Sequence, residues 1–245
     1  MGSRYSRLFF SFMVVRFRLI YFLPIILANL MLLACSSKSD PEVTDPSLDH
    51  VFEEVDLGLS VKWAACNVGA SKPSDYGFYF AWGECTDKFD FSWSNYLYAD
   101  GTDKSLTKYS SNINFGVDDD LLSLQIEDDA ANVNMGDTWR MPTDAEWDEL
   151  LNLCICLWTE VDSVEGYLFM STNPDYKDAT LFIPAGGYSD DCFIYTKGDS
   201  GYYWSASLVD SNPSCAYGII LNDKVQEWEQ APRYRGYNVR AVRDR

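Results

Sequence analysis

The sequence predicts one folded domain that combines short strands with two helices, and three observations support this expectation. Segments rich in β-branched and aromatic residues recur between Gly, Pro, Asn and Asp, as is typical of strands. Two other segments carry helix-start signals. Between residues 51 and 245 no linker or change in composition interrupts the chain, so we expect a single domain there.

Eight segments are expected to form strands. Each is short, and turn-forming residues bound it. The segments are SVKWAA, FYFAWGE, YLFMST, ATLFIPA, YYWSAS, AYGIIL, KVQEWE and YNVRAV, which begin at residues 60, 78, 167, 179, 202, 216, 224 and 237.

Two segments are expected to form helices. Residues 128–133 begin with acidic side chains, which favour the positive end of a helix dipole. The second helix starts at Thr143, whose hydroxyl caps the first free amides while Glu146 reaches back in a capping box. Trp147, Leu150 and Leu151 supply its buried stripe, and Pro142 keeps the preceding residue extended.

The first 34 residues have the pattern of a secretory signal. Four arginines precede an apolar run over residues 19–34, which contains Pro24 and Asn29. Its 16 residues fall short of the roughly 20 that a spanning helix needs. A basic flank, a short apolar core and a small residue before a break predict a signal peptide over residues 1–34. A start at Met1 and a start at Met13 both stay open.

The end of this segment, Leu-Leu-Ala-Cys at residues 32–35, resembles the cleavage motif of bacterial lipoproteins. The resemblance implies that Cys35 becomes the first residue of the mature chain and is acylated, for example with palmitate. Acyl chains would then tether the protein to a bilayer without spanning it. The alternatives are an apolar signal that happens to contain a cysteine and a simple membrane anchor.

Residues 35–50 are polar and contain proline, so we expect a flexible tether. Lys38, Asp40 and Glu42 loosely resemble the acid-rich signal that sends some lipoproteins to the cell surface. We therefore expect a lipid-anchored protein of the bacterial outer membrane, on the cell surface, with the periplasmic face as the alternative.

The charge balance argues against nucleic acid as a partner. Residues 1–34 hold four of the 19 basic residues and no acidic residue, so the remaining chain carries 15 basic and 37 acidic residues, a net charge of −22. Such a surface repels phosphate backbones. It also disfavours lying flat on anionic lipid, which leaves the lipid anchor as the expected contact with the membrane.

Five segments together resemble one known domain, the "Fibrobacter succinogenes major paralogous domain" of secreted and lipid-anchored bacterial proteins. They are residues 55–84, 127–151, 182–188, 201–207 and 235–242, which stand in the family's order, and the match spans nearly all of residues 51–243. That domain is in turn similar to the C-type-lectin-like scaffold of formylglycine-generating enzymes and of retroelement-diversified variable proteins. The resemblance implies an α+β, C-type-lectin-like fold with a small twisted antiparallel sheet, two helices and long ordered loops.

The same resemblance separates framework residues from ligand-facing ones. The Trp-Arg-x-Pro-Thr strand end and its helix would be framework, and a late Tyr-Trp-Ser stretch and a terminal strand would frame the ligand-facing surface. The expected structural residues are Trp63, Trp139, Arg140, Pro142, Thr143, Glu146, Trp147 and Trp204.

No catalytic residue is expected. The only histidine, His50, lies in the tether, which removes Ser-His and Cys-His pairs and histidine metal ligands from the domain. Formylglycine-generating enzymes depend on a late pair of cysteines, whereas Cys215 is the only cysteine after Cys192. Three function classes are considered, namely a ligand-binding protein, a passive envelope protein and an enzyme. An enzyme of the formylglycine-generating type is the least favoured of them.

The remaining cysteines and the acidic clusters have structural and functional interpretations. Six cysteines follow Cys35, and a disulfide between Cys66 and Cys154 is the favoured pairing because both flank framework segments. Buried free thiols are the alternative. Calcium, an oxygen-seeking ion, is a candidate ligand of the acidic clusters at residues 118–120, 127–129 and 190–191. None of these has the spacing of an EF-hand loop, so no metal site and no cofactor is assigned. Solvated acid is the alternative.

The late aromatic segment is the candidate binding face. Residues 186–237 contain seven of the 16 tyrosines, with Trp204, Trp228 and many small polar residues. Rigid amphipathic rings beside small polar side chains are typical of adaptable binding surfaces. The alternative is that about half of these rings pack the core, since strand positions alternate. The expected ligand-binding residues are Tyr202, Tyr217, Asn222, Glu227, Trp228, Arg233, Tyr234 and Arg235.

These expectations combine into one function. The chain is expected to be a surface lipoprotein that binds a glycan or protein ligand without catalysis, through the segment 186–237. The second function class is a passive envelope protein without a dedicated ligand. A contiguous exposed patch of Tyr202, Tyr217, Trp228 and Tyr234 would favour binding, and their burial would favour the passive class.

Overall fold

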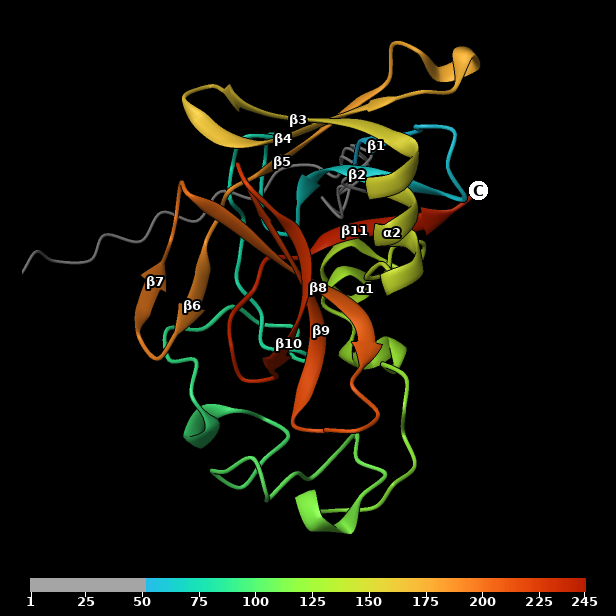
Figure 1. Cartoon of the computed structure of the whole chain (residues 1–245). Helices are drawn as coiled ribbons and strands as arrows, with labels where there is room; N and C mark the ends of the chain where they lie inside the picture. Colours follow the sequence, from blue (N-terminus) through green and yellow to red (C-terminus); the bar gives the residue numbers. More distant parts are fainter. Residues whose placement is uncertain (1–51) are drawn as a thin grey trace, which may run out of the picture. The chain divides into compact units, whose positions relative to one another are not determined.

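Antiparallel β-sheets and two α-helices make up the part of the chain described in the computed structural model, residues 52–245 (Figure 1). This combination confirms the α+β class. The described residues fall within one compact unit. The predicted signal peptide, the predicted lipidation site Cys35 and the predicted tether with His50 lie outside them. Among residues 52–245 there is no helix of the length and apolarity needed to cross a bilayer.

The first sheet joins the two ends of the described chain. Its strands are β1 (Glu54–Val55), β2 (Val61–Asn67) and β11 (Arg240–Asp244), in the order β1-β2-β11. Arg240 lies inside this sheet and is fully buried. Its guanidinium donates to Asn67 and to the carbonyls of Ala64, Ala65 and Phe182, at 2.8–3.0 Å. One side chain therefore ties β11 both to β2 and to the next sheet.

The second sheet has the order β3-β4-β5, formed by Cys154–Val161, Val164–Ser171 and Thr180–Pro184. Asp162 and Ser163 both have positive φ, at 52° and 63°, which makes the tight hairpin turn between β3 and β4. The β3–β4 ladder runs over all eight residues without a bulge. Strand β3 was not among the expected strands.

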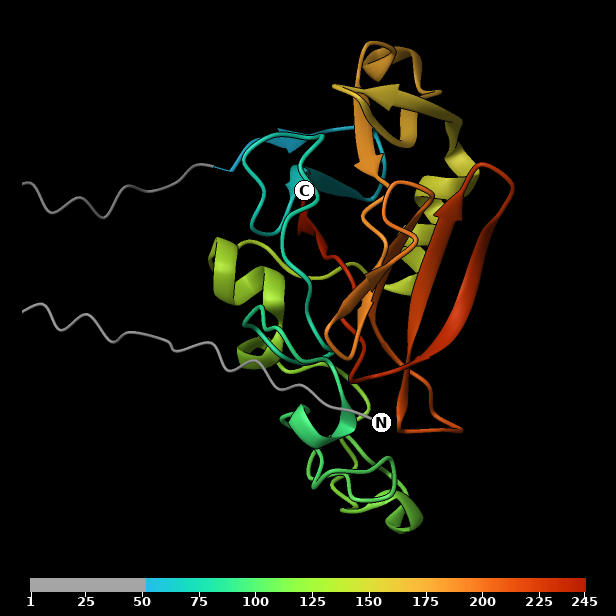
Figure 2. The same cartoon turned by 90° about the vertical axis from the view of Figure 1, so that its left-hand side faces the viewer.

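The third sheet carries the late aromatic segment. It has the order β10-β9-β8, from Gln226–Pro232, Cys215–Asn222 and Ser200–Leu208. A small hairpin of β6 (Tyr188–Asp190) and β7 (Phe193–Tyr195) precedes it in the chain. Figure 2 shows this hairpin beside the sheet, and a bridge between Gly187 and Gly201 joins the two.

The second helix begins where the sequence predicts its cap, and the first begins two residues later than expected. Helix α1 (Ala130–Met135) has Asp129 as its N-cap, and helix α2 (Asp144–Leu153) has Thr143. The capping box of Thr143 and Glu146 is present, which confirms that prediction. Trp147 and Leu150 are buried, and Leu151 packs at the core's edge. Helix α2 contacts β8 and leads directly into β3.

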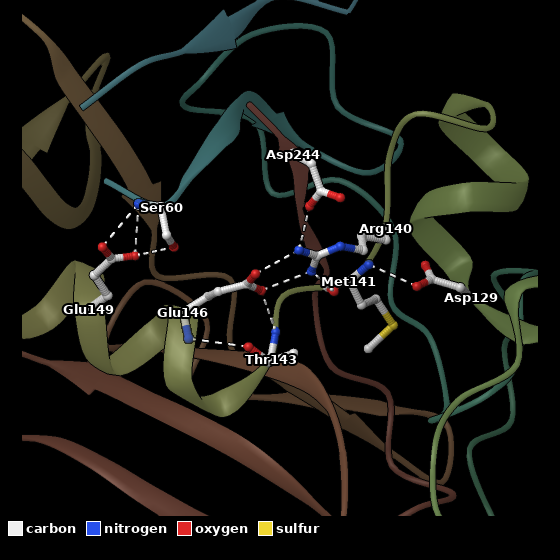
Figure 3. A network of polar contacts seen from close by, with 8 residues as sticks. All are labelled: Ser60, Asp129, Arg140, Met141, Thr143, Glu146, Glu149 and Asp244. Carbon is white, nitrogen blue, oxygen red and sulfur yellow. Dashed lines mark hydrogen bonds and ion pairs between the residues drawn. The ribbon is translucent and has the colours of Figure 1, made fainter. Parts of the chain in front are cut away.

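A network of polar contacts holds the start of α2 in place (Figure 3). Arg140 makes a two-pronged contact with Glu146, at 2.8 and 2.6 Å, and also reaches Asp244 of β11 at 2.8 Å. Glu146 in turn accepts from the backbone N–H of Thr143 at 2.8 Å. The Trp-Arg-x-Pro-Thr stretch is thus a structural joint between α2 and the terminal strand.

Long ordered loops occupy most of residues 68–129, with the 3-10 turns Trp93–Asn95, Ile113–Phe115 and Ile126–Asp128. A fourth such turn, Pro174–Tyr176, precedes β5. The strand expected at residues 78–84 is wrong, because only Phe80 makes a ladder contact, a single bridge to Tyr237. Gly77 precedes the segment and Gly83 lies within it, and their φ values of 72° and 82° break the extended path.

The core has two main parts, one on each side of β2. Trp63 lies in the cluster that includes Trp147 and Cys154, and Ala64 lies in the cluster built around Trp82 and Trp204. Trp63 and Trp204 are both fully buried, which confirms their predicted core positions. Trp139 is also buried, and Arg140 is half-buried at the molecule's edge.

The predicted disulfide between Cys66 and Cys154 is wrong. Both are free thiols, as are the four other cysteines of residues 52–245. The alternation of β2 supplies the reason, since Cys66 lies on the face of Ala64, whereas Cys154 packs with Trp63 on the opposite face. Both cysteines lie near the same sheet, next to framework segments, but they are on opposite sides of it.

Candidate ligand-binding surface

The expected binding face is divided between the two sides of sheet β10-β9-β8. In the register, Trp228 stands opposite Ile219 and Ile219 opposite Tyr203, so Trp228 lies on the side of the buried Tyr203. Tyr202 and Glu227 both pair with Ile220, so they lie on the other side. The expectation of one contiguous patch containing Tyr202 and Trp228 is therefore wrong.

The first side carries Tyr217 and Trp228. Their rings meet edge-on with centroids 6.4 Å apart, and both side chains are half-buried. The Trp228 indole N–H donates to Asp148 of α2 at 2.8 Å. Trp228 thus fastens the edge strand β10 to helix α2, and this contact has a structural purpose.

The second side carries a row of tyrosines. The rings of Tyr195 and Tyr188 stack with centroids 5.3 Å apart, and Tyr188 meets Tyr202 at 4.7 Å. Tyr202 and Tyr188 rest on the buried Tyr237, whose ring stacks on Trp204 at 4.2 Å. Tyr195 is 44% exposed, whereas Tyr237 is fully buried. The row therefore runs from the core to the surface.

An ion pair lies beside the middle ring of the row, Tyr188. Arg235 lies over the Tyr188 ring, 5.2 Å from its centroid, and its Nε donates to Asp190 at 2.9 Å. The hydroxyl of Tyr234 also donates to Asp190, at 3.2 Å. We call Tyr188, Asp190, Tyr195, Tyr202, Tyr234 and Arg235 the tyrosine surface.

Burial strengthens the preference of two phenols of this surface for the protonated form. It raises the pKa of Tyr202 and of Tyr234 above the ordinary value. Burial also raises the pKa of Tyr237, and the adjacent carboxylate of Glu229, which accepts a hydrogen bond from the Tyr237 hydroxyl, adds to the effect. The surface therefore offers neutral rings and hydroxyl groups, with its charges already paired.

Gly187 positions the hairpin that carries Tyr188 and Tyr195. It has a φ of 71°, a conformation that side chains other than glycine rarely adopt. A Cβ built there would lie only 2.1 Å from the carbonyl oxygen of Tyr195. Its own N–H donates to Ser200 at 2.7 Å, which ties the hairpin to the start of β8.

The predicted site residues have different positions. Tyr202, Tyr234 and Arg235 belong to the tyrosine surface, while Tyr217 and Trp228 lie on the other side of the sheet. Glu227 is exposed on the same side as Tyr202, and Asn222 lies in the β9–β10 turn, where its Oδ1 accepts from Lys224 and Val225.

The exposure expected for Arg233 is wrong. The side chain is fully buried, against the rings of Trp82 and Tyr96. Its guanidinium donates to the carbonyls of Tyr109 and Lys108 at 3.0 and 3.1 Å. Arg233 therefore anchors the long loops to the core, and it takes no part in the surface.

Sequence reasoning missed Tyr188, Asp190 and Tyr195 as members of the site. The available signal was the spacing of Tyr188 and Asp190, which places both side chains on one face of a strand. Arg235 comes from a segment 45 residues later and meets them only through the fold.

In each acidic cluster considered for calcium, at least one carboxylate is occupied by protein contacts. Asp119 accepts from the backbone amides of Tyr109, Ser110 and Leu121. Asp129 caps α1 and accepts from Met141, and Asp190 pairs with Arg235. Within residues 52–245 no three Asp, Glu, His or Cys side chains gather in a way that could hold a metal ion.

The two late cysteines are separated in the fold. Cys192 is exposed at the tip of hairpin β6–β7, and Cys215 is buried at the start of β9. Burial raises the pKa of the Cys215 thiol, which disfavours the reactive thiolate. Neither cysteine is in a disulfide.

The geometry is thus that of a tyrosine-rich surface supported by a rigid core. Charged groups at its edge orient the rings, and the hairpin β6–β7 forms its exposed end. Searches among protein-family models, curated proteins and solved structures found no match to this chain.

Proposed function

We propose that this protein is a lipid-anchored envelope protein that binds a glycan or protein ligand without catalysis, through the tyrosine surface. The observation that carries the proposal is the row of Tyr195, Tyr188 and Tyr202, which runs from solvent to the buried Tyr237. Rings held in this way present contact area that loses little conformational entropy on binding.

The surroundings of the row favour recognition over a passive role. Strand β7 is exposed throughout, and Phe193 and Ile194 beside Tyr195 are 65% and 48% exposed. Large apolar side chains gathered at the surface are typical of interaction sites. Arg235, which is paired with Asp190, lies over the Tyr188 ring and limits its movement.

The fold class supports a finer proposal. We infer a C-type-lectin-like scaffold, because small antiparallel sheets, two helices and long ordered loops are what the sequence resemblance implies. In that interpretation the Trp-Arg-x-Pro-Thr joint and its helix hold the late strands, and the late strands carry the ligand.

A glycan and protein array probed with the full-length chain in detergent would test binding. A ligand should be found, and Tyr195→Ala should weaken its binding about 10-fold or more, since truncating an aromatic anchor commonly costs over 1 kcal/mol. Tyr217→Ala, on the other side of the sheet, is the matched control and should bind normally. Equal binding by both variants would place the ligand elsewhere, and an array without any ligand would favour the passive class.

Anchoring at Cys35 has a separate test. Cells fed a fatty-acid analogue should label the wild-type chain and not Cys35→Ala, because acylation needs the sulfur. Protease treatment of intact cells should remove a surface-exposed domain. Equal labelling of the two chains would contradict lipidation, and protection from protease would indicate the periplasmic face.

A further inference from the structure

A polar cleft of about 560 Å³ lies where the ends of two sheets meet. Its walls come from hairpin β3–β4, from the turn before β8 and from the β9–β10 turn. It shares no residue with the tyrosine surface. The side chains used below are Trp158, Glu165, Asp199, Asn222, Asp223 and Lys224.

The cleft contains one aromatic platform. Trp158 is half-buried, and its ring meets that of Tyr167 edge-on, with centroids 5.2 Å apart. The Tyr167 hydroxyl donates to the backbone carbonyl of Asn222 at 2.8 Å, which links the platform to the opposite wall. An indole held beside polar groups can stack on the C–H face of a sugar ring.

The two turns that complete the cleft are fixed by backbone hydrogen bonds. The side-chain oxygen of Asn222 accepts from Lys224 and Val225 at 2.9 and 3.0 Å, so its amide NH₂ remains as a free donor. In the other turn, the amide of Gly198 donates to Ala185 at 2.8 Å and that of Asp199 donates to Thr196 at 2.9 Å. The walls are thus preorganised, which lowers the entropic cost of binding.

The charges of the cleft are not paired within the described chain. Glu165, Asp199, Asp223 and Lys224 form no ion pair among residues 52–245. Three carboxylates therefore face one ammonium group. Such a site attracts a cation and repels an anion.

A like-charge pair strengthens this argument. Glu165 of β4 stands directly opposite Glu160 of β3 in the ladder, on the same face as Trp158. Like charges opposite each other destabilise a sheet. A ligand that brings a positive charge next to Glu165 would relieve this repulsion and gain binding free energy from it.

We propose that the cleft binds a sugar that carries a protonated amine, such as a β-linked glucosamine oligosaccharide. Trp158 stacks on one ring, and the carboxylates of Asp199, Asp223 and Glu165, spread along the walls, pair with ammonium groups of the oligosaccharide. The amide of Asn222 and the ammonium of Lys224 donate to ring hydroxyls. The site is separate from the tyrosine surface and does not depend on the ligand of that surface.

Calorimetric titration of the full-length chain in detergent tests the proposal. The probe is the glucosamine trisaccharide, at mildly acidic pH where its amines are protonated, and its fully N-acetylated form is the neutral comparison. The amine form should bind, and the acetylated form should bind at least about 10-fold more weakly, since hydrogen bonds between charged groups contribute over 1.4 kcal/mol.

Two variants locate the binding site. Asp199→Asn combined with Asp223→Asn should weaken binding of the amine form at least about 10-fold, because it removes two negative charges and keeps the side-chain shapes. Asp210→Asn, at an exposed acid outside the cleft, is the control and should bind like the wild type. Trp158→Leu should weaken sugar binding, and cooperative thermal unfolding of this variant would show that it still folds.

Four results would overturn the proposal. They are no binding of the amine form, equal binding of the acetylated form, unchanged binding by the double variant, and binding of a trilysine peptide as tightly as the sugar. The last result would indicate a site for cationic peptides.

Discussion

Asp128 holds the long loops together through one carboxylate. It is 6% exposed and accepts from the hydroxyls of Tyr98 and Tyr109 and from the ammonium of Lys108. Tyr109 has a φ of 62°, which is unusual for a large aromatic residue. Burial alone would raise the pKa of the Asp128 carboxyl, but hydrogen bonds from Lys108 and the two tyrosines lower it below the ordinary value of 3.8.

A variant of this residue tests the sign of the effect. Asp128→Asn should lower the free energy of unfolding by about 2 kcal/mol at neutral pH, because the charged acceptor of three hydrogen bonds is lost. A carboxyl whose pKa is depressed by folding stabilises above its unfolded pKa and loses that contribution as the pH falls through the folded value.

The difference between the two chains should therefore shrink when the pH falls below 3.8. Urea unfolding at neutral pH and at acidic pH measures it. A difference that stays constant or grows in acid would contradict the depressed pKa.

At the residue scale, local chemistry was predictable and burial of charged side chains was not. Thr143 and Glu146 interact within one helical turn, so a stretch of four residues is enough to predict their capping box. Arg233 and Arg235 stand two positions apart, yet the first is enclosed by Trp82 and Tyr96 and the second is half-buried. The difference in burial depends on loops that lie more than 100 positions earlier in the sequence and fold over Arg233.

The start of α2 gives a prediction at the scale of an element. Thr143→Ala should lower the free energy of unfolding by about 1 kcal/mol, the usual effect of losing an N-cap side chain. Thr138→Ala changes an exposed threonine that makes no side-chain hydrogen bond in the described chain, so it is the matched control. Urea unfolding of both variants is the measurement, and an equal loss in both would argue against the cap.

Elements were predictable where sequence breaks bound them. Strands β2, β4, β5, β8, β9 and β10 all lie in segments that turn residues delimit. Strand β3 was missed because Cys154 follows Leu153 of α2 with no Gly or Pro between them. The segment at residues 78–84 has the composition of a strand, but its aromatic side chains reach the core from irregular backbone.

At the scale of the whole molecule, aromatic rings and buried arginines hold separate segments of the chain together. Trp63, Trp82, Trp147 and Trp204 fill the two main core clusters, and Arg233 and Arg240 join segments far apart in the sequence. The tyrosine surface and the polar cleft both depend on these contacts between segments, since each takes residues from several separate segments. For that reason the sequence indicated part of the composition of the tyrosine surface but not its location, and of the cleft it indicated only Asn222.

The free cysteines give a prediction for the molecule as a whole. A thiol reductant should leave the thermal midpoint unchanged, because no disulfide joins residues 52–245. A thiol reagent should label Cys192 first, since it is exposed, whereas burial raises the pKa of Cys154 to about 11 and that of Cys85 to about 12. Cys192→Ser should remove the fast labelling phase, and a lower midpoint in reductant would contradict the free thiols.

The absence of cystine from residues 52–245 has a consequence for how this part of the chain matures. We therefore expect its native state to form without an oxidant and without a disulfide isomerase, in oxygen-free surroundings as readily as in air.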